Sequence, residues 1–223
     1  MAIETVSVRD ELLELIASAR GDEKHDASSF STLDVLQVLY EELRVDPADP
    51  AWELRDRFIL SKGHGPLAYY AVLAHKGFFP SAELARFMRW DGILGAHPDR
   101  LQVPGVEAST GSLGHGLPMA VGVAYALRAR ALREQRVFIL TGDAELNEGS
   151  NWEAVLHAGS VRLDNLTLIV VDNRSSTVEL GEIGLKLRAF GWDALTVDGR
   201  NHDALRRAYR RRSDGPIAVV AVV

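Results

Sequence analysis

Polar side chains able to bind a metal ion follow two apolar runs in the sequence. Residues 137–140 lead into Asp143, and residues 166–171 lead into Asn173. The two polar residues lie about the length of one strand–helix–strand unit apart. If both runs are neighbouring parallel strands, their carboxyl ends meet at the same edge of a sheet. We therefore expect a carboxylate oxygen and an amide oxygen to converge on a single point.

Oxygen ligands of this kind suit Mg²⁺ or Ca²⁺, which proteins commonly hold with one or two carboxylates plus phosphate oxygens. An amide oxygen adds a ligand without adding charge, so the ion keeps a net positive charge and can accept a diphosphate. Gly142 would let the backbone approach such a ligand, and the predicted helix opening at 149–153 would favour an anion at its N-terminus. The alternative is that Asp143 and Asn173 only shape turns, as these residue types often do at strand ends.

Apolar patterning predicts the elements that would position these residues. Strands are expected at 57–60, 137–140, 166–171, 194–197 and 217–223, and helices at 8–20, 31–43, 66–76, 117–134, 152–161 and 203–212. The alternation predicts an α/β fold with a doubly wound, mostly parallel sheet and helices on both faces. Ser31 is expected to cap its helix, because Asp34 follows three residues later in a variant of the capping box. The Gly- and Pro-rich segment 91–113 is expected to be a long loop, either functional or disordered.

The composition fits one globular domain, and we expect residues 1–223 to form it. The 223 residues are 47% hydrophobic and 25% charged, and the net charge of -6 argues against a nucleic-acid binder. The absence of cysteine excludes disulfides, thiolate metal sites and cysteine nucleophiles, and it fits a reducing cytoplasm. We expect neither a signal peptide nor a membrane span. Five arginines within 206–212 indicate a solvated helix face or, alternatively, a contact with an anionic partner.

The sequence around Asp143 and Asn173 resembles the transketolase family. The metal and diphosphate motif of thiamine-diphosphate enzymes runs from Gly-Asp-Gly to an Asn about thirty residues later, and here it reads Gly142-Asp143-Ala144 and Asn173. Further blocks that look like this family lie at 141–154, 56–65, 96–99 with 105–116 and, more weakly, 24–31. The resemblance covers nearly the whole chain in family order. It is strongest to N-terminal subunits of split transketolases, whose diphosphate-binding and aminopyrimidine-binding domains are separate chains.

The resemblance implies a thiamine-diphosphate-binding fold with a defined metal site. Asp143 and Asn173 would bind Mg²⁺ (or Ca²⁺) through their side chains, and Ser175 through its backbone carbonyl. Ala144 stands where the family has glycine, and it keeps a backbone N–H contact to phosphate if its φ is negative. The positions that match cofactor-binding residues are His64, Gly111, Leu113, His115, Gly142, Asp143, Ala144 and Asn173.

Two histidines match residues that contact the substrate and assist proton transfer, a role that suits a group titrating near neutral pH. These are His25 and His97. The family usually has glycines directly after the first of them, whereas this chain has 26–28 as Asp-Ala-Ser. Glu148 and Glu153 match an acidic pair at the domain interface. Three further histidines have no such match: His75 and His202 are interpreted as surface residues and His157 as a packing residue.

The implied reaction is transfer of a two-carbon ketol unit from a ketose phosphate to an aldehyde-type or carrier acceptor. The carbon chemistry would belong to thiamine diphosphate, while the protein supplies position, metal and proton transfer. A C-terminal partner subunit would supply the cofactor-activating glutamate in an α2β2 assembly. The family also carries a further histidine past the last strand; either the partner supplies its function or the reaction does not need it. Neither nucleic acid nor membrane is expected as a partner. The alternatives are a related thiamine-diphosphate enzyme acting on 2-oxo acids and a non-catalytic regulatory subunit.

Overall fold

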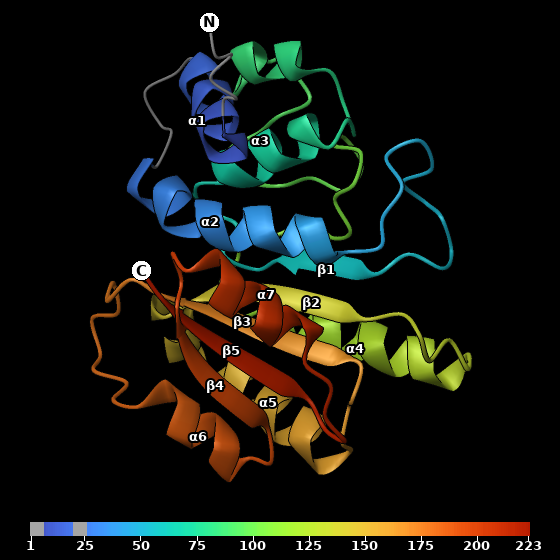
Figure 1. Ribbon diagram of the computed structural model, residues 1–223, viewed down its shortest axis with the longest axis vertical. Coiled ribbons are helices and arrows are strands. Elements are labelled where there is room, and N and C mark those ends of the chain that lie inside the picture. The colour runs from blue at the N-terminus through green and yellow to red at the C-terminus, as the bar shows by residue number, and fades with distance from the viewer. Residues whose placement is uncertain (1–6, 20–25) are drawn as a thin grey trace, which may run out of the picture.

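Five parallel strands form one sheet in the computed structural model, which describes residues 7–19 and 26–223 (Figure 1). Their order across the sheet is β1-β2-β3-β5-β4. The strands run over β1 (Arg57–Leu60), β2 (Val137–Gly142), β3 (Leu166–Asp172), β4 (Asp193–Asp198) and β5 (Ile217–Val222). Four of them are almost continuously apolar because both faces of the sheet are covered. The predicted α/β fold with a parallel sheet is confirmed.

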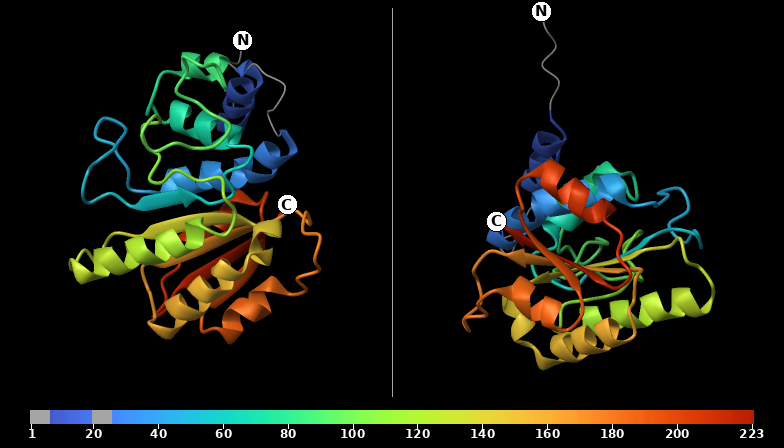
Figure 2. Two further views of the ribbon diagram at one scale, coloured as in Figure 1. Left: turned by 180° about the vertical axis from the view of Figure 1, so that it is seen from behind. Right: turned by 60° about the horizontal axis from the view of Figure 1, so that its bottom comes forward.

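Helices cover both faces, and alternate strand residues divide between the two cores. Phe138 and Leu140 of β2 pack with α1 (Val8–Ser18), α2 (Asp26–Glu42), α3 (Leu67–His75) and α7 (His202–Arg210). Val137 and Ile139 pack on the opposite face with α4 (Gly116–Ala129), α5 (Gly149–Ser160) and α6 (Ile183–Ala189). Both views in Figure 2 show α4, α5 and α6 together on one side of the sheet. This alternation is the period of two that a strand imposes on its side chains.

The register of the central strands sets where the site forms. Gly142, the last residue of β2, is paired with Val171 of β3. The backbone N–H of Asp143 donates to the Val171 carbonyl at 3.0 Å. Asp143 and Asn173 therefore follow two adjacent strands at the same edge of the sheet, as the sequence predicted.

Several predicted element bounds were wrong. The helix expected from Ser31 begins at Asp26, and the Ser31 hydroxyl donates to the Ser28 carbonyl inside the helix instead of capping it. The helix expected to reach 134 ends at Ala129, because the chain turns through a positive φ of 58° at Ala131. Helix α6 and two 3-10 helices, η1 (Ser81–Arg86) and η2 (Ala144–Asn147), were not predicted. Residues 87–115 carry no helix or strand, which agrees with the expected long loop.

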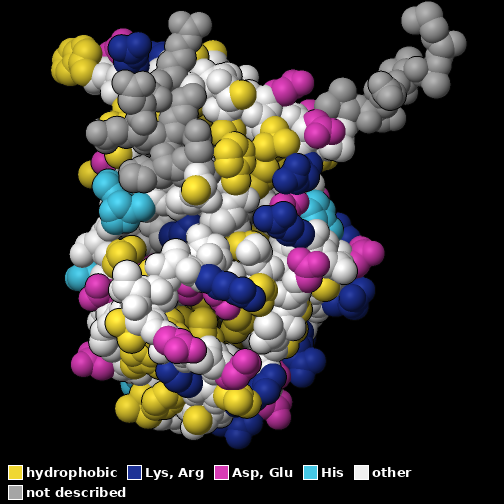
Figure 3. Space-filling view, turned by 90° about the vertical axis from the view of Figure 1, so that its left-hand side faces the viewer, with side chains coloured by type: hydrophobic (Ala, Val, Ile, Leu, Met, Phe, Trp, Pro, Cys, Tyr) yellow, Lys and Arg dark blue, Asp and Glu magenta, His cyan; other side chains and the backbone are white. Residues whose placement is uncertain are grey.

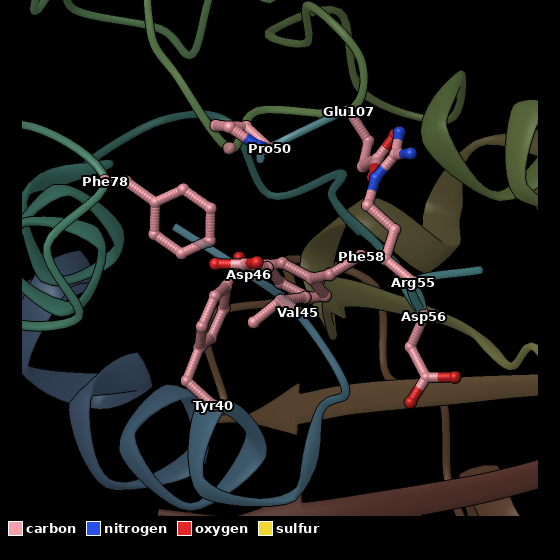
Figure 4. A pocket seen from close by; sticks show the side chains of 10 residues that line it. Tyr40, Val45, Asp46, Pro50, Arg55, Asp56, Phe58, Phe78 and Glu107 are labelled. Atoms are coloured by element: carbon pink, nitrogen blue, oxygen red, sulfur yellow. The ribbon is translucent and has the colours of Figure 1, made fainter. Parts of the chain in front are cut away.

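A buried ionic network holds the strand β1 in place at its other end. Asp56 has no exposed surface, and its carboxylate accepts hydrogen bonds from the backbone N–H and guanidinium groups of Arg44 and Arg136. Close by, Arg55 donates to both carboxylate oxygens of Glu107 at 2.6 and 2.8 Å, beside a cavity of about 10 Å³ (Figure 4). That volume fits one water molecule, so this region is structural and not a ligand site.

Within the described ranges, no helix combines the length and the apolar character that a membrane span requires.

Candidate cofactor site

Asp143 is a buried carboxylate held by the segment that follows β3. Its side chain lies where β2 ends and is only 3% exposed. The Ser175 hydroxyl donates to Oδ1 at 2.7 Å, and the Ser176 backbone N–H donates to Oδ2 at 3.1 Å. The segment after β3 therefore folds over Asp143 and fixes the direction of its carboxylate.

Asn173 places a carbonyl oxygen at the same edge with nothing in the described chain to bind it. Its Oδ1 is buried and has no hydrogen-bond partner among the described residues. A buried acceptor without a partner costs about 1–3 kcal/mol, so native proteins rarely keep one without reason. Immediately afterwards Arg174 adopts a left-handed φ of 56°, and its N–H donates to Asp172 Oδ1 at 3.2 Å. The strained turn at Arg174 holds Asn173 in place, and the unpartnered Oδ1 of the Asn173 side chain fits a bound cation.

The donor set fits a divalent ion that also binds phosphate. In the part of the chain that the structure describes, no three His, Asp or Glu side chains gather into a metal site of their own. An ion held by Asp143 and Asn173 would need more oxygen ligands, which backbone carbonyls and a diphosphate can supply. The Ser175 side chain is already bound to Asp143, so its carbonyl is the group left for the predicted role.

Ala144 does not have the positive φ that would make alanine unfavourable at this position. It lies at the start of η2 and is not among the residues with positive φ. Alanine therefore adopts this backbone without strain, and its N–H is as suitable for a phosphate contact as that of glycine. The preceding Gly142 packs closely against a lysine, because a Cβ built on it would lie 3.3 Å from Lys62 Cδ and Cε.

Lys62 is a feature of the site that sequence reasoning missed. It follows β1, the third strand of this edge, and its Nζ donates to the Ser28 hydroxyl at 2.7 Å and the Ser31 hydroxyl at 3.2 Å. Burial lowers the pKa of Lys62 to about 8, although the nearby carboxylates of Asp143 and Glu145 act in the opposite direction. The signal that could have revealed it was its place in the block 56–65, directly before His64.

His64 and His97 are brought together from segments far apart in the sequence. Their rings lie 4.6 Å apart, edge to face. Gly111, whose φ is 145°, lies directly under the ring of His97, because a Cβ there would fall 2.7 Å from His97 Cδ2. The structure therefore gathers three predicted residues at one place. His25 lies outside the described residues.

The remaining predicted residues lie around the start of α4 and α5. His115 is exposed, and its Nδ1 lies 3.1 Å from the carbonyl of the half-buried Leu113. Glu148 precedes α5 and Glu153 lies within it, and both are exposed. A cavity of about 480 Å³ opens beside Asp143, lined largely by residues 174–183. Figure 3 looks onto this edge, where acidic, basic and histidine side chains are mixed.

The groups outside the site have simpler roles. His202 binds Asp34 at 2.8 Å and is only partly exposed, while His75 contacts Glu11 at 3.3 Å. The packing interpretation of His157 was wrong, because its side chain is exposed beside the ring of Tyr125. The arginine cluster is largely paired with acidic residues, which favours the solvated helix face; the partners of Arg206, Arg210 and Arg211 are Glu41, Glu42 and Asp193.

Comparison with known proteins places this geometry in a family. The model of the transketolase thiamine diphosphate binding domain matches residues 7–214. The "Ferredoxin fas2" of Rhodococcoides fascians is 49% identical over 217 residues, which cover 96% of this chain and 71% of that protein. The 6-deoxy-6-sulfo-D-fructose transketolase subunit SqwG of Clostridium sp. (strain MSTE9) is 38% identical over 206 residues, covering 88% and 74%. The transketolase of Campylobacter jejuni superposes with a TM-score of 0.80 at 25% identity, covering 98% of this chain and 38% of that chain.

The sheet, its helices and the polar strand ends define an α/β protein of the thiamine-diphosphate-binding class. The chain belongs to the transketolase family and contains that family's thiamine diphosphate binding domain. It spans little more than a third of the solved transketolase from Campylobacter jejuni. The first relative is named as a ferredoxin, but this chain has no cysteine and so lacks the thiolates that hold ferredoxin clusters.

Proposed function

We propose that this chain is the N-terminal subunit of a transketolase-like transferase that works with a separate C-terminal subunit. The reaction is transfer of a two-carbon ketol unit from a ketose phosphate to an aldehyde-type or carrier acceptor. Family membership supports the transferase class, and relatives named as transketolase subunits support the division between two chains. Residues 1–223 act as a single cofactor-binding domain in this proposal.

The observation that carries the proposal is the buried carbonyl oxygen of Asn173, which has no hydrogen-bond partner among the described residues and follows the strand paired with the one that leads to the buried Asp143. In our proposal these two side chains and the Ser175 carbonyl hold Mg²⁺, which in turn holds the diphosphate. An ion so bound keeps a net positive charge, because only one of its protein ligands is charged. Lys62, which has no carboxylate within salt-bridge distance among the described residues, adds a second cationic group at this edge when protonated.

The other roles follow from where the side chains lie. Thiamine diphosphate, when bound, supplies the stabilisation of the carbanion that carbon–carbon cleavage requires. His64 binds near the diphosphate, and Gly111 and Leu113 line the thiamine rings together with His115. His97 and His25 bind the substrate and move protons. The contact between the rings of His97 and His64 supports placing His97 in the same site as His64. In this proposal the backbone N–H of Ala144 contacts a phosphate, and Gly142 lets the backbone approach the cofactor.

The partner would complete the site from outside this chain. We propose an α2β2 assembly in the cytoplasm, in which the C-terminal subunit provides the aminopyrimidine-binding domain. Glu148 and Glu153 lie on the exposed surface at the start of α5, and both are free of ion pairs within the described part of the chain. This exposure supports a contact with another subunit, where the two carboxylates would link active sites.

Substitution of Asp143 distinguishes a catalytic subunit from a purely regulatory one. In the complex co-expressed with a candidate C-terminal chain, Asp143→Ala should abolish Mg²⁺-dependent thiamine diphosphate binding, measured by titration calorimetry, and also ketose-phosphate cleavage. Asp214→Ala is the matched control, since it removes a carboxylate whose side chain is 97% exposed. A complex that keeps full activity with Asp143→Ala would contradict the proposal, and cleavage of 2-oxo acids in place of ketose phosphates would correct the donor.

A further inference from the structure

We infer that Glu145 is a positioning residue that ties together the three loops of the proposed cofactor site. These loops are 61–65 after β1, 110–116 before and into α4, and 143–148 after β2. They carry His64, the pair Gly111 and Leu113, and Asp143, respectively. The inference rests on the proposed function and assigns to it a residue that touches neither metal nor cofactor.

The hydrogen bonds of Glu145 join the loops directly. Its side chain is only 1% exposed, and a single oxygen, Oε1, accepts from the Ser61 hydroxyl and from the Gly114 backbone N–H at 3.0 Å. The Ser61 hydroxyl in turn accepts from the Gly116 N–H at 3.1 Å. Hydrogen bonds to an ionised carboxylate are stronger than those between neutral groups. One residue after β2 therefore holds both the end of β1 and the start of α4.

Glycines allow the loops to approach this closely. Gly114 has a left-handed φ of 80°, and a Cβ there would lie 2.5 Å from Glu148 Cβ. A Cβ on Gly116 would collide with the Ser61 hydroxyl, and one on Gly63 would lie 2.8 Å from the backbone nitrogen of Gly111. Because each of these glycines packs directly against a neighbouring loop, a shift of one loop displaces the next.

The backbone of Glu145 is fixed as well, so its carboxylate cannot move away without cost. The Asn151 side-chain amide donates to the Glu145 carbonyl at 2.7 Å from within α5. The Ser150 hydroxyl donates to the Gly114 carbonyl at 2.7 Å, which ties the same loop to the start of that helix. Burying a carboxylate is unfavourable unless it is paired or hydrogen-bonded, and the bonds to Oε1 offset part of that penalty, while Oε2 is buried with no hydrogen-bond partner among the described residues. The arrangement orients the loops before any ligand binds.

Hydrogen exchange followed by mass spectrometry tests this inference on the full chain without cofactor. In Glu145→Ala, exchange should accelerate in 61–65 and 110–116, while 193–198 and 217–222 stay as protected as before. In the complex with the C-terminal chain, the affinity for thiamine diphosphate in the presence of Mg²⁺ should fall roughly 10- to 100-fold, as it does when residues that orient the direct ligands are lost. Glu145→Gln keeps one carbonyl oxygen and should restore most of both properties. Asp143→Ala should lower the affinity without changing exchange in 61–65 or 110–116.

Unchanged exchange in both loops of a folded Glu145→Ala protein would overturn the inference, and so would acceleration spread equally over the whole sheet. If Glu145→Ala does not fold, Ser61→Ala takes its place, since it removes one donor to Glu145 and the acceptor of Gly116. Normal protection of 110–116 in that variant would equally overturn it. A wild-type complex that binds no thiamine diphosphate would refute the proposed function alone, because the exchange results do not depend on the cofactor.

Discussion

The Ser175 hydroxyl donates a hydrogen bond of 2.7 Å to Asp143 Oδ1, from the segment after β3 to the end of β2. The bond uses the side chain of Ser175 and leaves its backbone carbonyl available to the proposed metal ion. The sequence assigned Ser175 only the carbonyl role, so the hydroxyl adds a second function at the same residue. Together with the Ser176 backbone N–H at Oδ2, it fixes the direction of the carboxylate.

Removing the Ser175 hydroxyl should lower the stability of the fold slightly and the metal-dependent binding of cofactor moderately. Ser175→Ala keeps the backbone carbonyl and the Ser176 N–H bond, so we expect the free energy of unfolding to fall by about 1 kcal/mol. Denaturant unfolding measures this, with Ser160→Ala as a control that loses only a hydrogen bond within α5. Loss of metal-dependent binding as complete as in Asp143→Ala would instead make the hydroxyl itself the ligand.

Asn173→Ala should separate binding from stability. The substitution removes a buried oxygen that has no partner among the described residues, so we expect the free energy of unfolding to stay within about 1 kcal/mol of wild type. The affinity for thiamine diphosphate in the presence of Mg²⁺ should nevertheless fall at least tenfold, by analogy with the effect of lost metal-site support. Calorimetry and denaturant unfolding together check this. A destabilised protein with normal affinity would show that Asn173 serves the fold and not the ion.

Lys62 should titrate far below an ordinary lysine. Its pKa is lowered from 10.5 to about 8 by burial, so between these values the unfolded chain binds more protons at this residue than the folded chain does. The contribution of Lys62 to the free energy of unfolding is therefore lowest below pH 8 and rises with pH across that window. Carbon-13 NMR of reductively methylated protein should show one amine with a midpoint near 8 that disappears in Lys62→Met. A midpoint above 10 for that resonance would contradict the buried environment.

The loop at Gly114 should tolerate no side chain. With a φ of 80° and a Cβ position 2.5 Å from Glu148 Cβ, Gly114→Ala combines backbone strain with a collision. We expect a loss of roughly 1–3 kcal/mol in the free energy of unfolding. The matched control is Gly122→Ala in α4, where nothing lies within 4 Å and alanine favours the helix. Equal stability of both variants would show that the loop adjusts freely.

The strands could be predicted from the sequence because they are the simplest pattern in it. The unbroken apolar run that includes Val137 and the similar run from Leu166 gave both central strands within two residues of their ends. The position of Asp143 beside Asn173 followed, since parallel neighbours end at one edge. The fold class and the central pair of the site are therefore properties of local pattern and topology.

Other features depend on contacts between distant residues and could not be read from a local pattern. Ser31 looked like a helix cap, but a serine also fits inside a helix when its hydroxyl binds the carbonyl three residues before it. The burial of Glu145 and the lowered pKa of Lys62 arise where β1, α4 and β2 meet. Charged residues are usually exposed, so residue type alone does not indicate that Glu145 and Lys62 are buried.

The measurement that tests the account most directly is thiamine diphosphate binding and ketose-phosphate cleavage by this chain, a candidate C-terminal chain, and the two co-expressed, each with Mg²⁺ and with EDTA. We predict that both activities appear only in the mixture with Mg²⁺ and vanish with Asp143→Ala. Binding of cofactor by neither chain nor mixture would contradict the account, and the role of a non-catalytic regulatory subunit would then replace it.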